Sequence, residues 1–150
     1  MIKFFILGAL IGSFLNVVIF RLPNNQSIIN PRSHCRNCKN NIPFYLNIPI
    51  ISYIILRGKC QNCHATISPQ YIIVELLTGI LFYLLFYALP IDKAMLLSIV
   101  FSCLIIISFI DYSYYLIPSS LLFSLLILLI PYSLFYKIAI YQILIGALSI

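Results

Sequence analysis

Long apolar runs, separated by polar stretches, dominate this sequence of 150 residues. The runs cover residues 4–20, 71–89, 94–110 and 117–136, and a further run begins at residue 138 and continues to residue 150. At about 1.5 Å per residue, the first run reaches about 25 Å, which is just enough to cross the hydrocarbon core of a bilayer. The pattern therefore predicts four transmembrane helices and the beginning of a fifth.

The first apolar run has a second interpretation, as a cleaved signal peptide. Against this, no small-residue cleavage site follows the run, and Gly12, Ser13 and Asn16 lie at its centre. We therefore interpret residues 1–20 as an uncleaved first transmembrane helix.

Residues 21–70 differ in kind from the rest of the chain. They hold four of the five cysteines and six of the nine basic residues, namely Arg21, Arg32, Arg36, Lys39, Arg57 and Lys59. The positive-inside rule places such a loop in the cytoplasm and the N-terminus outside. Within it, the apolar residues 46–56 are too few to span, so they lie at the membrane interface or pack on the bundle. Residues 71–150 would then form the rest of the bundle.

The composition agrees with a membrane protein and excludes an ordinary soluble domain. The chain is 63% hydrophobic and only 8% charged, far from the usage of soluble proteins. Its net charge of +6 is explained by the basic loop, for which anionic lipid headgroups are the expected partner rather than nucleic acid. We predict an all-α integral membrane protein, a multi-span helix bundle with a small cytoplasmic loop.

Two short cysteine motifs stand inside that loop. Cys35, Cys38, Cys60 and Cys63 form a C-x2-C-x21-C-x2-C pattern. Two such turns can complete a tetrahedral four-thiolate zinc site, which would be structural because every coordination position is filled. Disulfides are the weaker alternative in a reducing cytoplasm, and unrelated free cysteines are weaker still.

Three other residues have side chains that can bind a metal, but they are not the expected ligands. His34 and His64 flank the two cysteine motifs and could replace a ligand, although solvated or outer positions around the metal fit them better. Cys103 lies inside the third apolar run and is most simply a small packing residue.

The chain has three acidic residues, Glu75, Asp92 and Asp111. Asp92 falls in a short outer turn at residues 90–93, where water can solvate it. Glu75 begins a span, where a carboxylate favours the positive end of the helix or pairs with a loop arginine. Asp111 follows seventeen uncharged residues, so it is either a solvated helix end or a functional carboxylate at the membrane surface.

Several short stretches occur together in an order that resembles one family. They are GSFLNVVIFRLP at residues 12–23, Asn47-Ile48-Pro49, LRGKC at 56–60, ISPQY at 67–71, VELLTG at 74–79, and Phe109-Ile110-Asp111 with Ile117-Pro118. Together they are similar to the signatures of the type IV prepilin leader peptidases, over essentially the whole chain.

This resemblance implies an aspartic endopeptidase of the bacterial inner membrane. The family removes the basic leader of prepilins and pseudopilins at the cytoplasmic face, and many members then methylate the new N-terminus with S-adenosylmethionine. Asp111 matches the family's first catalytic aspartate. The second lies in a G-x-G-D motif, which is absent here, so the chain is expected to be truncated before it. Ser113 and Ser119 also stand at positions that are often acidic in the family.

The missing motif matters because an aspartic peptidase needs two carboxylates in opposite protonation states. Asp111 would be one of them, and these 150 residues alone are not expected to cleave prepilin. Two non-catalytic alternatives remain: a truncated family member without activity, or a membrane-anchored zinc-binding adaptor.

Overall fold

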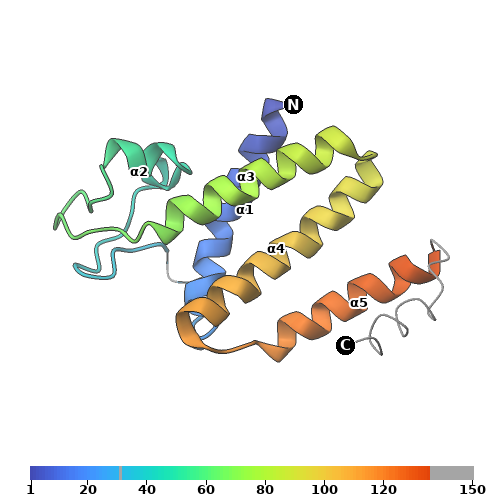
Figure 1. The fold of residues 1–150 in the computed structure, drawn as a ribbon. Coiled ribbons are helices and arrows are strands. Elements are labelled where there is room, and N and C mark those ends of the chain that lie inside the picture. Colours follow the sequence, from blue (N-terminus) through green and yellow to red (C-terminus); the bar gives the residue numbers. More distant parts are fainter. Residues whose placement is uncertain (31, 136–150) are drawn as a thin grey trace. The chain divides into compact units, whose positions relative to one another are not determined.

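The structure describes residues 1–30 and 32–135, and the regular secondary structure of this part of the chain is helical (Figure 1). This computed structural model has long helices at α1 (Ile2–Arg21), α3 (Gln70–Ala88), α4 (Ile91–Tyr114) and α5 (Ser119–Phe135). A 3-10 turn, η1 (Phe44–Asn47), and a short helix, α2 (Ile51–Ile55), lie between α1 and α3. Among these residues there are two isolated bridges and no strand. The predicted all-α class is confirmed.

The chain divides into two compact units, Met1–Leu116 and Ile117–Ile150. The first unit contains α1, α3, α4 and the segment 22–69, which we call the cysteine loop. The second contains α5, whose seventeen residues include four serines and no charged residue. The predicted fifth span, residues 138–150, lies outside the described residues.

Helices α1, α3 and α4 are each long and apolar enough to cross a membrane. Many of their large apolar side chains are exposed in the isolated chain, including Leu10, Phe14, Ile80, Leu84 and Ile99. Side chains of this kind are stable when they contact lipid, and a helix satisfies all of its own backbone hydrogen bonds there. These three helices confirm the predicted membrane-protein class.

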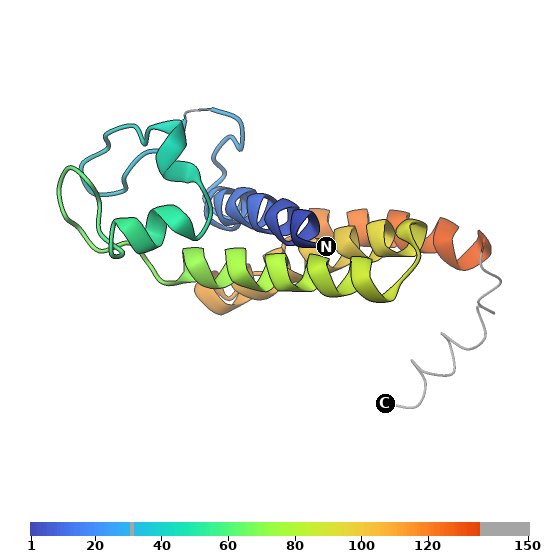
Figure 2. The same cartoon turned by 90° about the horizontal axis from the view of Figure 1, so that it is seen from above.

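Helix α1 packs closely on α3, and Figure 2 shows the two helices one above the other. Two glycines make this approach possible. A Cβ atom added at Gly8 would lie 2.6 Å from the carbonyl oxygen of Thr78, and one at Gly12 would lie 2.9 Å from the Cα atom of Glu75. Small residues spaced in this way let transmembrane helices approach backbone to backbone.

Helix α4 is longer at both ends than the apolar run that predicts it. It begins at Ile91, directly after Pro90, so Asp92 lies in its first helical turn rather than in a loop. It continues past residue 110 to Tyr114, and therefore Asp111 lies in its last turn. Polar residues at the ends of a helix do not interrupt its backbone hydrogen bonds, which is why hydropathy alone places the ends too far inward.

Candidate functional site

The two cysteine motifs fold into matching turns. The backbone N–H of Cys35 donates to Asn40 and that of Cys60 donates to Ala65, each over 2.9 Å. The carbonyls of the same two cysteines accept hydrogen bonds from Lys39 at 2.9 Å and from His64 at 3.0 Å.

Lys39 and His64 both have positive φ angles, of 57° and 54°, a backbone region that L-residues enter mainly in tight turns. Each turn is also closed by one antiparallel bridge, His34 with Asn41 and Lys59 with Thr66. Each of these contacts in the first turn therefore recurs in the second turn, between residues 25 positions later in the chain.

The four thiols of these turns form one group. The Sγ atoms of Cys35, Cys38, Cys60 and Cys63 all lie within 4.8 Å of one another, and those of Cys35 and Cys63 are 3.7 Å apart. In a tetrahedral zinc site with Zn–S bonds of about 2.3 Å, neighbouring sulfurs are about 3.8 Å apart. The sulfur spacing fits a metal ion, and 3.7 Å is far too long for a disulfide bond of about 2.05 Å.

Backbone amides in the turns favour thiolates, the form that binds a metal. The N–H of Ala65 lowers the pKa of Cys63 to about 6, and the N–H of Cys38 lowers the pKa of Cys35. For Cys38, the N–H of Asn40 lowers the pKa, but removal from water and the neighbouring thiols outweigh it and raise the value to about 11. Close sulfurs therefore do not all ionise at neutral pH without a cation among them.

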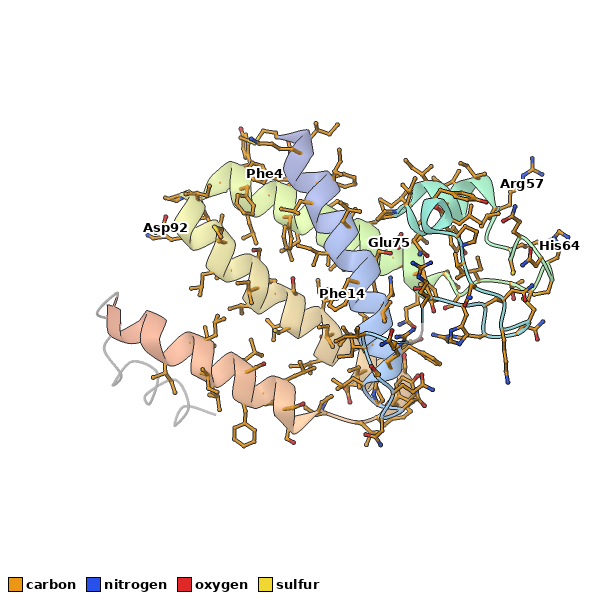
Figure 3. All side chains as sticks on the ribbon, turned by 180° about the vertical axis from the view of Figure 1, so that it is seen from behind. Phe4, Phe14, Arg57, His64, Glu75 and Asp92 are labelled. Carbon is orange, nitrogen blue, oxygen red and sulfur yellow. The ribbon has the colours of Figure 1, made fainter. Side chains whose placement is uncertain are left out.

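The two histidines of the cysteine loop are not part of the thiol group. Both side chains are exposed, and the His34 ring nitrogen Nδ1 lies 3.1 Å from the carbonyl oxygen of Arg32. Figure 3 labels His64, with Arg57, at the outer edge of the loop. Their positions agree with the interpretation of these residues as solvated.

Arg36, between the first two cysteines, connects the cysteine loop to the helices. Its guanidinium carbon lies 3.7 Å from the centre of the Phe20 ring on α1. Its Nη2 donates a hydrogen bond of 3.0 Å to the Tyr71 hydroxyl at the start of α3. From the sequence alone, Arg36 is one of six basic residues in the loop, because neither partner can be found without knowing how the loop folds.

Glu75 makes a second connection between the cysteine loop and α3, and Figure 3 places it where that helix meets the loop. Its Oε2 accepts a hydrogen bond of 2.7 Å from the backbone N–H of Ile50. Ile50 has a φ angle of +64°, which is rare for a β-branched residue and marks local backbone strain. The sequence predicts a helix-end role or an arginine partner for Glu75, and the observed partner is instead this strained amide.

Asp111 is exposed, in the last turn of α4. The chain leaves that helix through Tyr115, whose φ is +54° and whose N–H donates to the Asp111 carbonyl over 2.8 Å. Asp92 lies nineteen residues earlier on the same helix, a distance of about 28 Å along the axis. Asp92 therefore cannot form a catalytic pair with Asp111.

Comparison with known proteins places the chain in a family. The sequence model of the bacterial peptidase A24 N-terminal domain matches residues 6–89, which include α1, the cysteine loop and α3. No solved structure matches the chain.

Several curated relatives share the name prepilin leader peptidase/N-methyltransferase. The protein of that name from Myxococcus xanthus is 42% identical over 118 residues, covering 78% of this chain and 35% of the relative. The one from Vibrio cholerae is 35% identical over 142 residues, covering 88% of this chain and 56% of the relative. The chain thus spans about a third to a half of the length of these relatives. It belongs to the prepilin leader peptidase/N-methyltransferase family.

Proposed function

We propose that this chain is part of an enzyme that removes the leader peptide of prepilins or pseudopilins at the cytoplasmic face of the inner membrane. The observation that carries the proposal is family membership together with an exposed carboxylate, Asp111, at the end of a membrane-length helix. The relatives' names include leader-peptide removal and N-methylation, and both activities belong to the proposal for the complete protein.

In the proposed mechanism, Asp111 is one of two carboxylates. One carboxylate is ionised and takes a proton from the attacking water, while the other is protonated and polarises the scissile carbonyl. Neither of the other two acids of this sequence is proposed as the partner. Asp92 is too far along α4, and Glu75 is engaged with the cysteine loop. We place the second aspartate outside these 150 residues, which hold no G-x-G-D motif.

The zinc site is proposed as a structural element of the same enzyme. Cys35, Cys38, Cys60 and Cys63 would hold the ion, since their sulfur spacing fits tetrahedral coordination. A bound zinc ion stabilises a fold that has little core of its own. With four thiolates around it, the ion has no open position for water and takes no part in cleavage.

The proposed orientation puts the cysteine loop in the cytoplasm and the N-terminus outside. The basic residues of the loop outnumber those expected outside by six to three, in agreement with the positive-inside rule. Anionic lipid headgroups would contact the loop, and the prepilin substrate would approach from the same side.

S-adenosylmethionine is the expected methyl donor of an N-methyltransferase. The described residues contain no glycine-rich strand-to-helix turn of the type that binds nucleotides. We therefore assign none of them to this cofactor and derive no step through it.

A cleavage assay on the complete protein tests the proposal. Asp111→Asn keeps the shape of the side chain but removes its ability to ionise, so leader removal should fall to background while the protein still folds. Asp92→Asn, on the same helix, should cleave like the unmodified protein. Full processing by Asp111→Asn would exclude the proposed mechanism.

A complete protein that cleaves no prepilin at all would favour the alternative of a non-catalytic family member. This alternative is retained because these 150 residues contain no G-x-G-D motif.

A further inference from the structure

A cavity of about 360 Å³ lies between the cysteine loop and the helices α1 and α3. Ser13 and Asn16 of α1, Tyr71 and Glu75 of α3, and Arg36 of the loop contribute to its lining. It is separate from Asp111 and from any step that the proposed cleavage mechanism uses.

Asn16, which helps to line this cavity, has a side-chain acceptor without a donor. Its side chain is only 3% exposed. The amide nitrogen Nδ2 donates a hydrogen bond of 3.0 Å to the carbonyl oxygen of Tyr71, and this contact fixes which end of the amide is oxygen. That oxygen, Oδ1, is buried and has no hydrogen-bond partner among the described residues. Buried acceptors are almost always paired, so this one indicates a missing donor.

Glu75 adds a carboxyl group to the same wall. It is 7% exposed, and its carboxylate interacts with the Ile50 N–H and the Ser13 side chain. A carboxylate has about four acceptor positions, so these two contacts leave others open. Within the described part of the chain, no basic side chain forms an ion pair with Glu75. A buried carboxylate without a cation is costly, and a ligand that brings one would be favoured.

The two arginines that line the cavity are engaged elsewhere. Arg36 stacks on Phe20 and donates to the Tyr71 hydroxyl, while Arg21 donates to the backbone carbonyls of Ser27 and Ile28 over 2.8 and 3.2 Å. The acceptor groups of Asn16 and Glu75 are therefore not served by either guanidinium.

We propose that this cavity binds a primary ammonium group of a polypeptide, which donates hydrogen bonds to Asn16 Oδ1 and to the Glu75 carboxylate. A primary ammonium has three donors, no acceptor and one positive charge, and so it matches both groups at once. The identity of this ammonium group rests on the proposed function. It is either the new N-terminal amine that leader removal creates or a lysine side chain of the basic leader.

Calorimetric titration of the purified chain in nanodiscs tests this site with three tripeptide amides. The first is trialanine amide with a free amino terminus, the second is its N-acetylated form, and the third is N-acetylated with a central lysine. Amidated C-termini keep a carboxylate from binding the arginines. We expect N-acetylation of trialanine amide to weaken binding about 10- to 100-fold, as loss of a charge-assisted hydrogen bond does. If the first peptide binds more tightly than the third, the site takes an N-terminal amine. If the third peptide binds more tightly than the first, the site takes a lysine side chain.

Variants then locate the site. Glu75→Gln and Asn16→Ala should each weaken ammonium binding about tenfold or more, whereas Asp92→Asn and Asp111→Asn should leave it unchanged. Circular dichroism checks that each variant folds. If Glu75→Gln does not fold, Asn16→Ala alone provides the test, because it removes the Oδ1 acceptor and leaves Glu75 unchanged.

The proposal is overturned if acetylated and free trialanine amide bind equally and the lysine peptide does not bind. It is also overturned if folded Glu75→Gln and Asn16→Ala bind like the unmodified chain. Because Asp111→Asn should retain binding, failure of this site and failure of the proposed peptidase activity are separate results.

Discussion

Replacing Gly12 by alanine should separate α1 from α3 and destabilise the protein. The added Cβ would overlap the Thr78 hydroxyl and lie 2.9 Å from the Glu75 Cα atom, whereas ordinary contacts begin at 3.4 Å. Backbone cannot rotate out of the way, and the Thr78 hydroxyl already donates to the Val74 carbonyl over 2.7 Å. The helices must therefore move apart by about 0.5 Å, the difference between these two distances.

The same movement reaches the cavity under the cysteine loop. The hydrogen bond from Asn16 to Tyr71, now 3.0 Å, would lengthen to about 3.5 Å, where such bonds are weak. Overpacking costs about 1–3 kcal/mol, and the better helix propensity of alanine offsets up to about 1 kcal/mol. We expect a net loss of about 1–2 kcal/mol, or a fall in melting temperature of about 2–8 °C.

Thermal unfolding in detergent, followed by circular dichroism, measures this change. Phe14→Ala is the matched control, because Phe14 is on the same helix with its side chain 54% exposed, and its melting temperature should stay close to that of the unmodified protein. If Gly12→Ala is as stable as the unmodified protein, α1 and α3 do not pack closely at Gly12.

Two further predictions concern the cysteine loop. Under reducing conditions, the purified protein should contain about one zinc ion per chain, measured by elemental analysis. Cys38→Ser should contain almost no zinc, whereas the control His34→Ala should keep it. A metal-free unmodified protein would exclude the site. Arg36→Lys keeps the charge but loses the planar contact with Phe20 and the reach to Tyr71. This change should cost about 1 kcal/mol and speed proteolysis of the loop roughly fivefold, and an unchanged rate would show that Arg36 does not hold the loop.

Hydropathy and spacing predict the parts of this protein that depend on local sequence. A run of apolar residues is sufficient to predict a helix of membrane length, and two C-x2-C turns are sufficient to predict that their thiols gather. The structure bears out both features, in α1, α3 and α4 and in the four-thiol group.

The contacts between segments could not be predicted in this way. Gly12 contacts α3 only because α1 turns that face toward it, and the hydrogen bond between Ile50 and Glu75 joins residues 25 positions apart. A pattern along one segment does not specify which other segment it meets. The same reason left Arg36 as one basic residue among six, although GALIG at residues 8–12 has a small-residue spacing that signals helix packing.

Thiol labelling of residue 111 in intact cells tests most directly whether Asp111 can act at the cytoplasmic face. Asp92→Cys and Asp111→Cys place a thiol near each end of α4, about 28 Å apart, which is close to the thickness of the hydrocarbon core at about 30 Å. With a membrane-impermeant maleimide and the unmodified protein as background, Asp92→Cys should label in intact cells and Asp111→Cys only after permeabilisation. Labelling of Asp111→Cys in intact cells would put this carboxylate outside and contradict the proposed peptidase function.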